Sequence, residues 1–341
     1  ETVIILVFLG SKVFQRLGIP QVVGFIVMGV LLGSSFLNIV PLELTEELIF
    51  ISQIALGLIG FDMGSHLRLG ELRRLGRSLV FILLFEAIGT FGIVTAGVYA
   101  ITQSWHTALI FGALSSATAP AATVDVLAEY DAKGPLTTSL LAVVGMDDAV
   151  ALILYSIAAA LSASLLAGSG PPSFLNTIKL PLIEIGGSVV LGLGMGLLLD
   201  LIMRRMGRQH DAMAVSIGFV FLSVGISQSL GFSLILTTMI LGMVVVNRSP
   251  EHGRHIRFTI EQAGPVIYVL FFALVGARIQ IALLPAMGLL GVAYVVLRST
   301  GKFVGAWVGG TLGAAEPVVR NNLGFGLLSQ AGVAIGLALD C

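Results

Sequence analysis

The sequence predicts an all-α protein that crosses a membrane many times. Hydrophobic residues make up 56% of the 341-residue chain, charged residues make up only 11%, and the mean hydropathy is +1.02. Because soluble domains carry about 25% charged residues, this composition excludes a soluble globular fold. A transmembrane β-barrel is disfavoured as well, since its strands give short alternating segments and this chain has long unbroken apolar runs.

The apolar runs divide into twelve predicted membrane segments, since about 20 helical residues cross the hydrocarbon core. In chain order they are 2–17, 19–34, 46–63, 78–102, 106–127, 135–167, 180–203, 211–230, 232–247, 257–277, 284–313 and 321–341. The longer ones are expected to tilt or to extend beyond the bilayer. The chain starts at Glu1 rather than at methionine and stops in or just after an apolar run, so we expect residues to be missing at both ends.

Positive charges in the loops predict the orientation of these segments. Fourteen of the loop Lys and Arg residues fall in odd-numbered loops, whereas only Lys179 and Arg278 fall in even-numbered ones. Cytoplasmic loops are enriched in Lys and Arg, so the odd-numbered loops are predicted to be cytoplasmic and Glu1 to lie outside, in a cell (inner or plasma) membrane. The net charge of −1 argues against a nucleic-acid partner, and the single cysteine, Cys341, excludes an internal disulfide.

Two segments carry a similar short motif. Gly112–Ala117 reads GALSSA and Gly326–Ala331 reads GLLSQA, and the predicted orientation makes the two segments enter the membrane from opposite sides. Such similarity between oppositely oriented helices is typical of inverted-topology repeats. Both segments are predicted to be broken helices, because Pro120 and Gly332 lie at mid-membrane depth among small polar residues.

Polar side chains at the two predicted breaks are candidates for contacts with the backbone or with a bound ion. Hydroxyl and amide groups can satisfy the main-chain groups that a broken helix leaves free, and the oriented carbonyls of such breaks are a usual means of holding an ion. These polar residues are Ser115, Thr118, Thr123, Ser329 and Gln330, and Pro120 joins them as the residue that breaks the first helix.

Two adjacent acids, Asp147 and Asp148 in GMDDAV, lie in the middle of segment 135–167. Charges inside a membrane are costly and usually functional. Neighbouring helix positions point about 100° apart, so one acid can face a water-filled cavity while the other faces the broken helices. Because desolvated neighbouring acids can hold protons or one small cation but not both, the sequence predicts a site where protons and a cation compete. No further metal and no cofactor are expected.

A cationic partner is predicted at the same depth. Asp147 lies 12 residues into its segment and Lys302 lies 13 residues before Ala315, which places each about 18–20 Å from the cytoplasmic end of its segment. Lys302 is expected to pair with an aspartate when no ion is bound, and to lose its proton as a coupled base when the ion takes that aspartate.

Three other charged residues are candidates for supporting roles. Arg298, one turn outward from Lys302, cannot lose its proton and is expected to be structural. Glu86 is the other in-membrane acid that can neutralise either cation, and we assign it with Arg298 to a structural ion pair, although residue counting places Glu86 nearer the cytoplasm. Asp125, near a cytoplasmic segment end, is a candidate for guiding ions at a funnel mouth.

Six stretches in order along nearly the whole chain carry a family resemblance. They are RLGIPQVVGFIVMGVLLG (Arg16–Gly33), ATAPAATVDVLAEYDAKGPL (Ala117–Leu136), GMDDAVALI (Gly145–Ile153), LFFALVGARI (Leu270–Ile279), GKFVGAWVGG (Gly301–Gly310) and GLLSQAGVAIGLAL (Gly326–Leu339). The chain resembles the monovalent cation/proton antiporter superfamily, in its bacterial sodium/proton exchanger-like branch. The family's aspartate pair matches Asp147 and Asp148, and its core lysine matches Lys302. The resemblance implies electrogenic exchange of sodium or lithium for protons by an elevator-like motion, in a homodimer.

The resemblance also implies a domain organisation. A dimerisation domain is expected from residues 1–77 and 206–281, and a core transport domain from residues 78–167 and 282–341, with a linker helix in 168–205. The core is expected to hold two crossing broken helices, 106–127 and 321–341, beside the aspartate helix 135–167. The family's thirteen-helix form ends with one more core helix, which is expected to be missing from this chain.

Other functions are kept as alternatives. A potassium/proton antiporter of the same fold is the nearest, and a passive cation channel is more remote. An intramembrane aspartyl protease needs its aspartates on two facing helices, whereas here they are adjacent and the one Tyr-Asp pair, Tyr130–Asp131, lies in a loop. The sequence therefore predicts a secondary transporter with a role in pH homeostasis rather than an enzyme, and leaves open the cation, the stoichiometry and the direction of transport.

Overall fold

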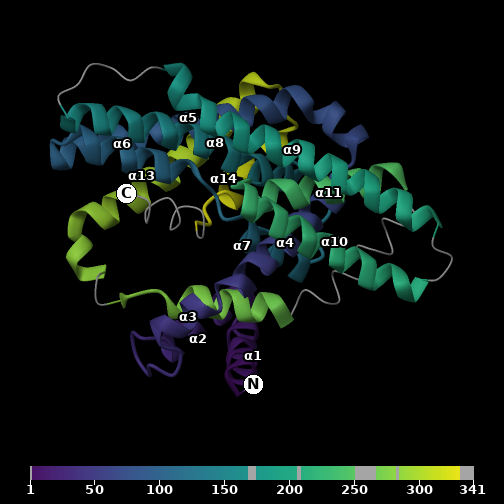
Figure 1. The fold of residues 1–341 in the computed structure, drawn as a ribbon. Coiled ribbons are helices and arrows are strands. Elements are labelled where there is room, and N and C mark those ends of the chain that lie inside the picture. The colour runs from purple at the N-terminus through teal and green to yellow at the C-terminus, as the bar shows by residue number, and fades with distance from the viewer. Residues whose placement is uncertain (1, 168–173, 206–208, 250–265, 282–283, 331–341) are drawn as a thin grey trace. The chain divides into compact units, whose positions relative to one another are not determined.

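The computed structural model describes residues 2–167, 174–205, 209–249, 266–281 and 284–330, most of which form helices (Figure 1). Within these ranges there is no β-strand, only an isolated β-bridge between Gly33 and Val40. Six of the described helices are long and apolar enough to cross a membrane, and four shorter apolar helices accompany them. The predicted all-α polytopic membrane protein is confirmed, whereas the count of twelve crossings stays a prediction.

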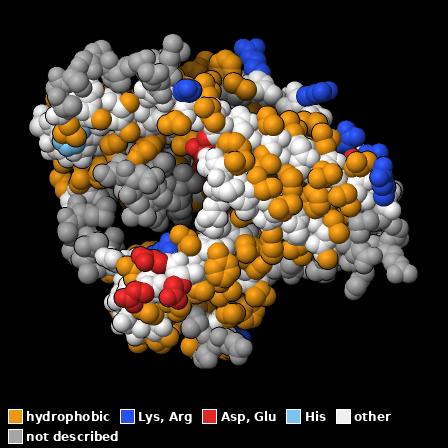
Figure 2. All heavy atoms as spheres, in the orientation of Figure 1, with side chains coloured by type: hydrophobic (Ala, Val, Ile, Leu, Met, Phe, Trp, Pro, Cys, Tyr) orange, Lys and Arg blue, Asp and Glu red, His pale blue; other side chains and the backbone are white. Residues whose placement is uncertain are grey.

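Large hydrophobic side chains cover much of the surface. Figure 2 shows hydrophobic side chains over much of the visible face, with charged side chains in only a few places. The side chain of Leu180 is 75% exposed, that of Leu289 is 73% exposed and that of Val190 is 71% exposed. Patches of this kind mark contact with a membrane or a partner rather than with water.

The chain folds into two compact units. The described residues of the first unit fall within 1–66, 124–132 and 190–286, and those of the second within 67–123, 133–189 and 287–341. The domain roles implied by the family resemblance stay a prediction, because a division into units does not show what each unit does.

The first unit is built around a close pair of helices. It contains α1 (Thr2–Arg16), α2 (Gln21–Leu32), α3 (Leu42–Glu47), α4 (Ile49–His66), α10 (Gln209–Leu230), α11 (Leu234–Arg248) and the helix Val266–Ala277. α4 packs against α11, and α10 packs against both. A Cβ added to Gly242 of α11 would overlap the Phe61 carbonyl of α4, so only glycine permits this approach.

The second unit contains the helices that carry most of the predicted site residues. They are α5 (Leu69–Thr102), α6 (Trp105–Ser116), α8 (Pro135–Ala167), α13 (Leu284–Leu312) and α14 (Pro317–Gly326). α5, α6 and α8 pack against one another, and α14 packs against α8. α7 (Pro120–Glu129) and α9 (Phe174–Arg205) pass from one unit to the other.

Several element boundaries differ from the prediction. α5 begins at Leu69 rather than at residue 78, because Arg73, Arg74 and Arg77 extend the helix beyond its apolar part. The short polar helix α3 was not predicted. α13 contains a break at Gly288, whose φ is 49°. Residues 257–265 and 331–341 of the predicted segments lie outside the described residues.

Gly242→Ala is expected to destabilise the first unit, because the new methyl group meets the Phe61 carbonyl. Overpacking of this kind costs about 1–3 kcal/mol, which a lower thermal unfolding midpoint of the purified protein in detergent would report. Gly218→Ala in α10 is the matched control, since a Cβ there meets open space. An unchanged midpoint for Gly242→Ala would contradict the close approach of α4 and α11.

Candidate functional site

The predicted break in the first motif segment is present between α6 and α7. α6 ends at Ser116, α7 begins at Pro120, and Ala117 between them has an extended backbone (φ −69°, ψ 144°). Proline lacks an N–H group and disfavours a helical conformation at the residue before it. Pro120 therefore explains why the helix ends here and resumes in a new direction.

The second motif segment meets this break. α14 ends at Gly326, and residues 327–330 are not helical. The Ala119 amide donates to the Ser329 carbonyl at 3.1 Å, and the Thr123 and Ser329 hydroxyls lie 3.0 Å apart. The predicted continuation of the segment over residues 331–341 lies outside the described residues, so the second broken helix and the inverted repeat stay predictions.

Arg298 of α13 links the break between α6 and α7 to the non-helical residues 328 and 329. Its guanidinium donates to the main-chain carbonyls of Leu328 at 2.8 Å, Ala117 at 2.9 Å and Ser329 at 3.1 Å, and the residue is only 3% exposed. The expected ion pair between Arg298 and Glu86 is therefore replaced by contacts with the backbone. The physical reason is that broken helices leave carbonyls without donors, and a guanidinium can satisfy several of them at once.

Glu86 instead lies against Lys302. The Lys302 ammonium donates to the Glu86 carboxylate at 2.6 Å, to the Asp147 carboxylate at 2.9 Å and to the main-chain carbonyl of Ser116. All three ionisable side chains are 0% exposed. Counting residues placed Glu86 nearer the cytoplasm than Asp147. The Lys302 side chain is nevertheless long enough for its ammonium to contact both acids. One ammonium therefore serves two buried carboxylates.

The two neighbouring aspartates have different surroundings. Asp147 accepts a hydrogen bond from the Thr118 hydroxyl at 2.5 Å in addition to that from Lys302, on the same oxygen. Both carboxylate oxygens of Asp148 are buried and have no hydrogen-bond partner among the described residues. As the helix geometry predicts, the two acids point in different directions. Asp147 is charge-compensated and Asp148 is not.

Of the remaining predicted residues, Ser115 and Gln330 have structural contacts. The Ser115 hydroxyl donates within its own helix to the Gly112 carbonyl at 2.6 Å. The Gln330 amide donates to the Leu114 carbonyl at 3.0 Å and to the Tyr294 hydroxyl at 2.7 Å. Asp125 lies in the part of α7 that belongs to the other compact unit, so its role as an ion guide stays a prediction.

Two groups that contact the predicted site residues were not themselves predicted from the sequence. The Ser116 carbonyl is a main-chain group and leaves no signal in residue types. Tyr294 lies two helical turns before Lys302 on α13 and supports Gln330 at the break. Its spacing from Arg298, one turn, is the signal that could have identified it.

Arg298→Met is expected to destabilise the second unit by about 3 kcal/mol, because three main-chain carbonyls lose the donor that this buried residue provides. The thermal unfolding midpoint of the purified protein reports the loss. Arg73→Met removes the same charge from an exposed position and should leave the midpoint unchanged. Equal midpoints for both variants would show that Arg298 does not hold the breaks together.

Comparison with known proteins identifies the family of this chain. A family model described as "Sodium/hydrogen exchanger, transmembrane" matches residues 3–339. The high-affinity Na⁺/H⁺ antiporter NhaS3 of Synechocystis is 24% identical over 376 residues, covering 97% of this chain and 79% of its own length. The ammonium/H⁺ antiporter subunit AmhT of Alkalihalophilus pseudofirmus is 23% identical over 320 residues, covering 90% and 78%.

A solved structure shares the fold. The sodium proton antiporter MjNhaP1 of Methanocaldococcus jannaschii superimposes with a TM-score of 0.81 at 18% identity, covering 99% of this chain and 83% of that one. The resemblance indicated by the six sequence stretches is thus confirmed at the level of the family. The chain belongs to the sodium/hydrogen exchanger family of the monovalent cation/proton antiporter superfamily, whose members are membrane transporters rather than enzymes.

Proposed function

We propose that this chain is a secondary antiporter that exchanges sodium, or lithium, for protons. Membership of the family supports the class of transport, and the names of the two relatives above support cation/proton antiport. The observation that carries the proposal is the contrast within the aspartate pair. Asp147 is held by Lys302 and Thr118, whereas Asp148 lacks a partner among the described residues.

Asp148 is the group at which protons and the cation compete in this proposal. A buried carboxylate without a partner is stable only when its charge is neutralised. A proton on Asp148 achieves this, and so does a cation held between Asp148 and the oxygens beside it. Hard cations take oxygen ligands, and the Thr118 hydroxyl brings a neutral oxygen to the neighbouring Asp147. One occupant excludes the other, which is the coupling that an antiporter requires.

Asp148→Asn is expected to abolish sodium-dependent proton movement in proteoliposomes, measured by dequenching of a pH-sensitive dye when sodium is added. An amide neither takes up a proton near neutral pH nor neutralises a cation. Asp131→Asn is the matched control, because it makes the same chemical change at an exposed turn position whose φ of 45° asparagine also adopts. Wild-type exchange in Asp148→Asn would exclude Asp148 as the carrier. Potassium and ammonium in the same assay separate the alternative cations from sodium and lithium.

The cluster around Lys302 supports electrogenic exchange of two protons for one cation. Two buried carboxylates share one ammonium, so Glu86, Asp147 and Lys302 together are neutral only when one carboxylate carries a proton. With no cation bound, Lys302 pairs with Asp147 and a proton resides on Glu86. When a cation binds Asp148 and takes Asp147 as a further ligand, Lys302 keeps Glu86 as its ionised partner and the proton on Glu86 leaves. The first proton therefore comes from Asp148 and the second from Glu86, and Lys302 stays charged throughout.

Lys302→Arg tests which group releases the second proton, because arginine cannot lose its proton. If Glu86 is the source, Lys302→Arg keeps a two-to-one reversal potential in proteoliposomes with an imposed membrane voltage. The double variant Glu86→Gln/Lys302→Arg should then become one-to-one, since only Asp148 still exchanges a proton. One-to-one exchange in Lys302→Arg alone would instead assign the second proton to Lys302, as the sequence had suggested.

An elevator-like motion fits the placement of the cluster. Glu86, Asp147, Asp148 and Lys302 all belong to the unit formed by residues 67–123, 133–189 and 287–341. A unit that holds every charged member of the cluster can move without breaking the ion pairs among them. We assign the transport role to this unit and the dimerisation role to the other, with a second copy of this chain as the expected partner.

A further inference from the structure

A cavity of about 400 Å³ lies between α13 and α14 in the second unit. It is lined by Phe303, Val304 and Trp307 of α13 and by Asn321 of α14. Val304 is 41% exposed and Trp307 is 46% exposed, so the cavity opens at the surface. The proposed ion-binding residues do not line it.

The surroundings of the cavity are those of a membrane-facing groove. α13 is one of the described helices that are long and apolar enough to cross a membrane. Phe325 and Val318 of α14 are 62% and 57% exposed, which continues the apolar surface beside the groove. Trp307 lies five residues before the end of α13 at Leu312, or about 7–8 Å along the axis. Tryptophan at such a distance from a helix end is typical of the membrane–water interface.

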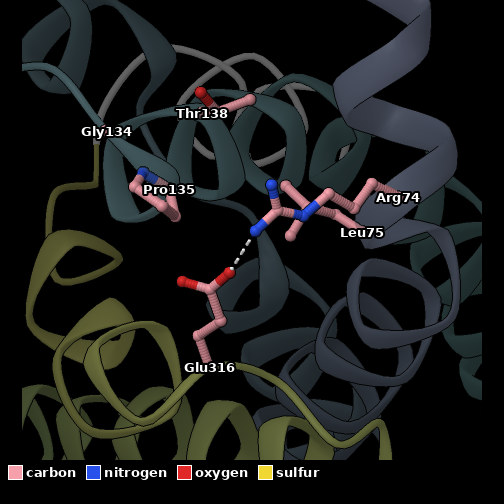
Figure 3. Close-up of a pocket in the computed structure, with 6 residues that line it drawn as sticks. All are labelled: Arg74, Leu75, Gly134, Pro135, Thr138 and Glu316. Atoms are coloured by element: carbon pink, nitrogen blue, oxygen red, sulfur yellow. Dashed lines mark hydrogen bonds and ion pairs between the residues drawn. The ribbon is translucent and has the colours of Figure 1, made fainter.

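A cation, Arg320, lies beside Asn321, one of the residues that line this groove. The Arg320 Nε donates to the Asn321 side-chain oxygen at 3.2 Å, and Arg320 packs on Gly310 near the end of α13. Its terminal guanidinium nitrogens have no partner within the described part of the chain. The acid one turn earlier, Glu316, turns away toward Arg74, with which it forms an ion pair at 2.9 Å (Figure 3). The charge of Arg320 is therefore uncompensated next to an apolar groove.

We propose that this groove binds an anionic phospholipid. The phosphate lies on the Arg320 guanidinium, the glycerol region lies near Asn321 and Trp307, and an acyl chain follows Val304 and Phe303. A guanidinium matches a phosphodiester in charge and geometry. A soluble anion would not fill the apolar part of the groove, whereas a lipid of the surrounding leaflet brings both chemistries at once.

The lipid would support α14, the helix that leads into the non-helical residues 327–330. The inner face of α14 is already tightly packed, since a Cβ on Gly324 would contact Phe303 and one on Gly326 would contact Leu140. The outer face carries the exposed Phe325 and Val318. A bound acyl chain covers the edge between α13 and α14 that protein atoms leave open.

The two tryptophans of the chain make the test direct, since Trp105→Phe leaves Trp307 as the only one. Trp105 stacks on Tyr99, and phenylalanine preserves that ring contact. Quenching of Trp307 is measured in vesicles that contain either brominated phosphatidylglycerol or brominated phosphatidylcholine. We expect phosphatidylglycerol to be preferred at Trp307 by about five-fold, as one nearby arginine predicts.

Arg320→Gln should remove the preference, and Arg73→Gln, which removes an exposed arginine elsewhere in the same unit, should keep it. Equal quenching by both lipids in the parent protein overturns the proposal. Weak quenching of Trp307 by both brominated lipids also overturns the proposal, because it shows that a second copy of the chain or another protein covers the groove.

A second measurement needs no change to the tryptophans. Native mass spectrometry of delipidated protein after addition of phosphatidylglycerol should show one tightly retained lipid fewer per chain in Arg320→Gln than in wild type or in Arg73→Gln. Equal retention by all three proteins contradicts the site. Retention of inorganic phosphate in place of the lipid contradicts it as well, since it would show that the apolar groove contributes nothing.

Discussion

One lysine that serves two buried carboxylates is the constraint on which the rest of the second unit depends. Lys302, Glu86 and Asp147 come from α13, α5 and α8, and none of the three side chains is exposed. Removing one partner from such a group leaves a buried charge uncompensated, which is strongly destabilising. The three helices are thereby tied together at the depth where Asp148 lies. The same constraint limits the number of protons that the cluster can hold.

Groups at the break between α6 and α7 also contact this cluster. The Ser116 carbonyl accepts from Lys302, and Thr118, two residues further on, donates to Asp147. These groups are available because the helix stops before Pro120. Arg298 then links this break to residues 328 and 329. The Lys302 cluster, the break before Pro120 and residues 328 and 329 therefore form one connected set of contacts inside one compact unit.

Some features of the fold and the site could be predicted from the sequence because their signals are local. Pro120 and Pro135 begin α7 and α8, and the apolar runs locate the long helices. Equal depth along two segments predicted that Lys302 lies near Asp147. The early start of α5 was missed because hydropathy detects only the apolar part of a helix.

Other features depend on groups that residue types do not reveal. Arg298 was expected to pair with an acid, but its partners are main-chain carbonyls of the non-helical residues 117, 328 and 329. Glu86 was expected to neutralise either cation, and only the structure shows that its partner is Lys302. The difference between Asp147 and Asp148 follows from which neighbour each one faces, and two identical residues in adjacent positions give no sequence signal for it.

The most direct measurement of the central claim is the number of protons released when sodium binds to the purified protein. Calorimetric titration in buffers with different ionisation enthalpies reports that number at equilibrium, without transport. Competition at Asp148 together with the shared ammonium of Lys302 predicts close to two protons released for each sodium bound. Sodium binding without any proton release would contradict competition at the buried acids.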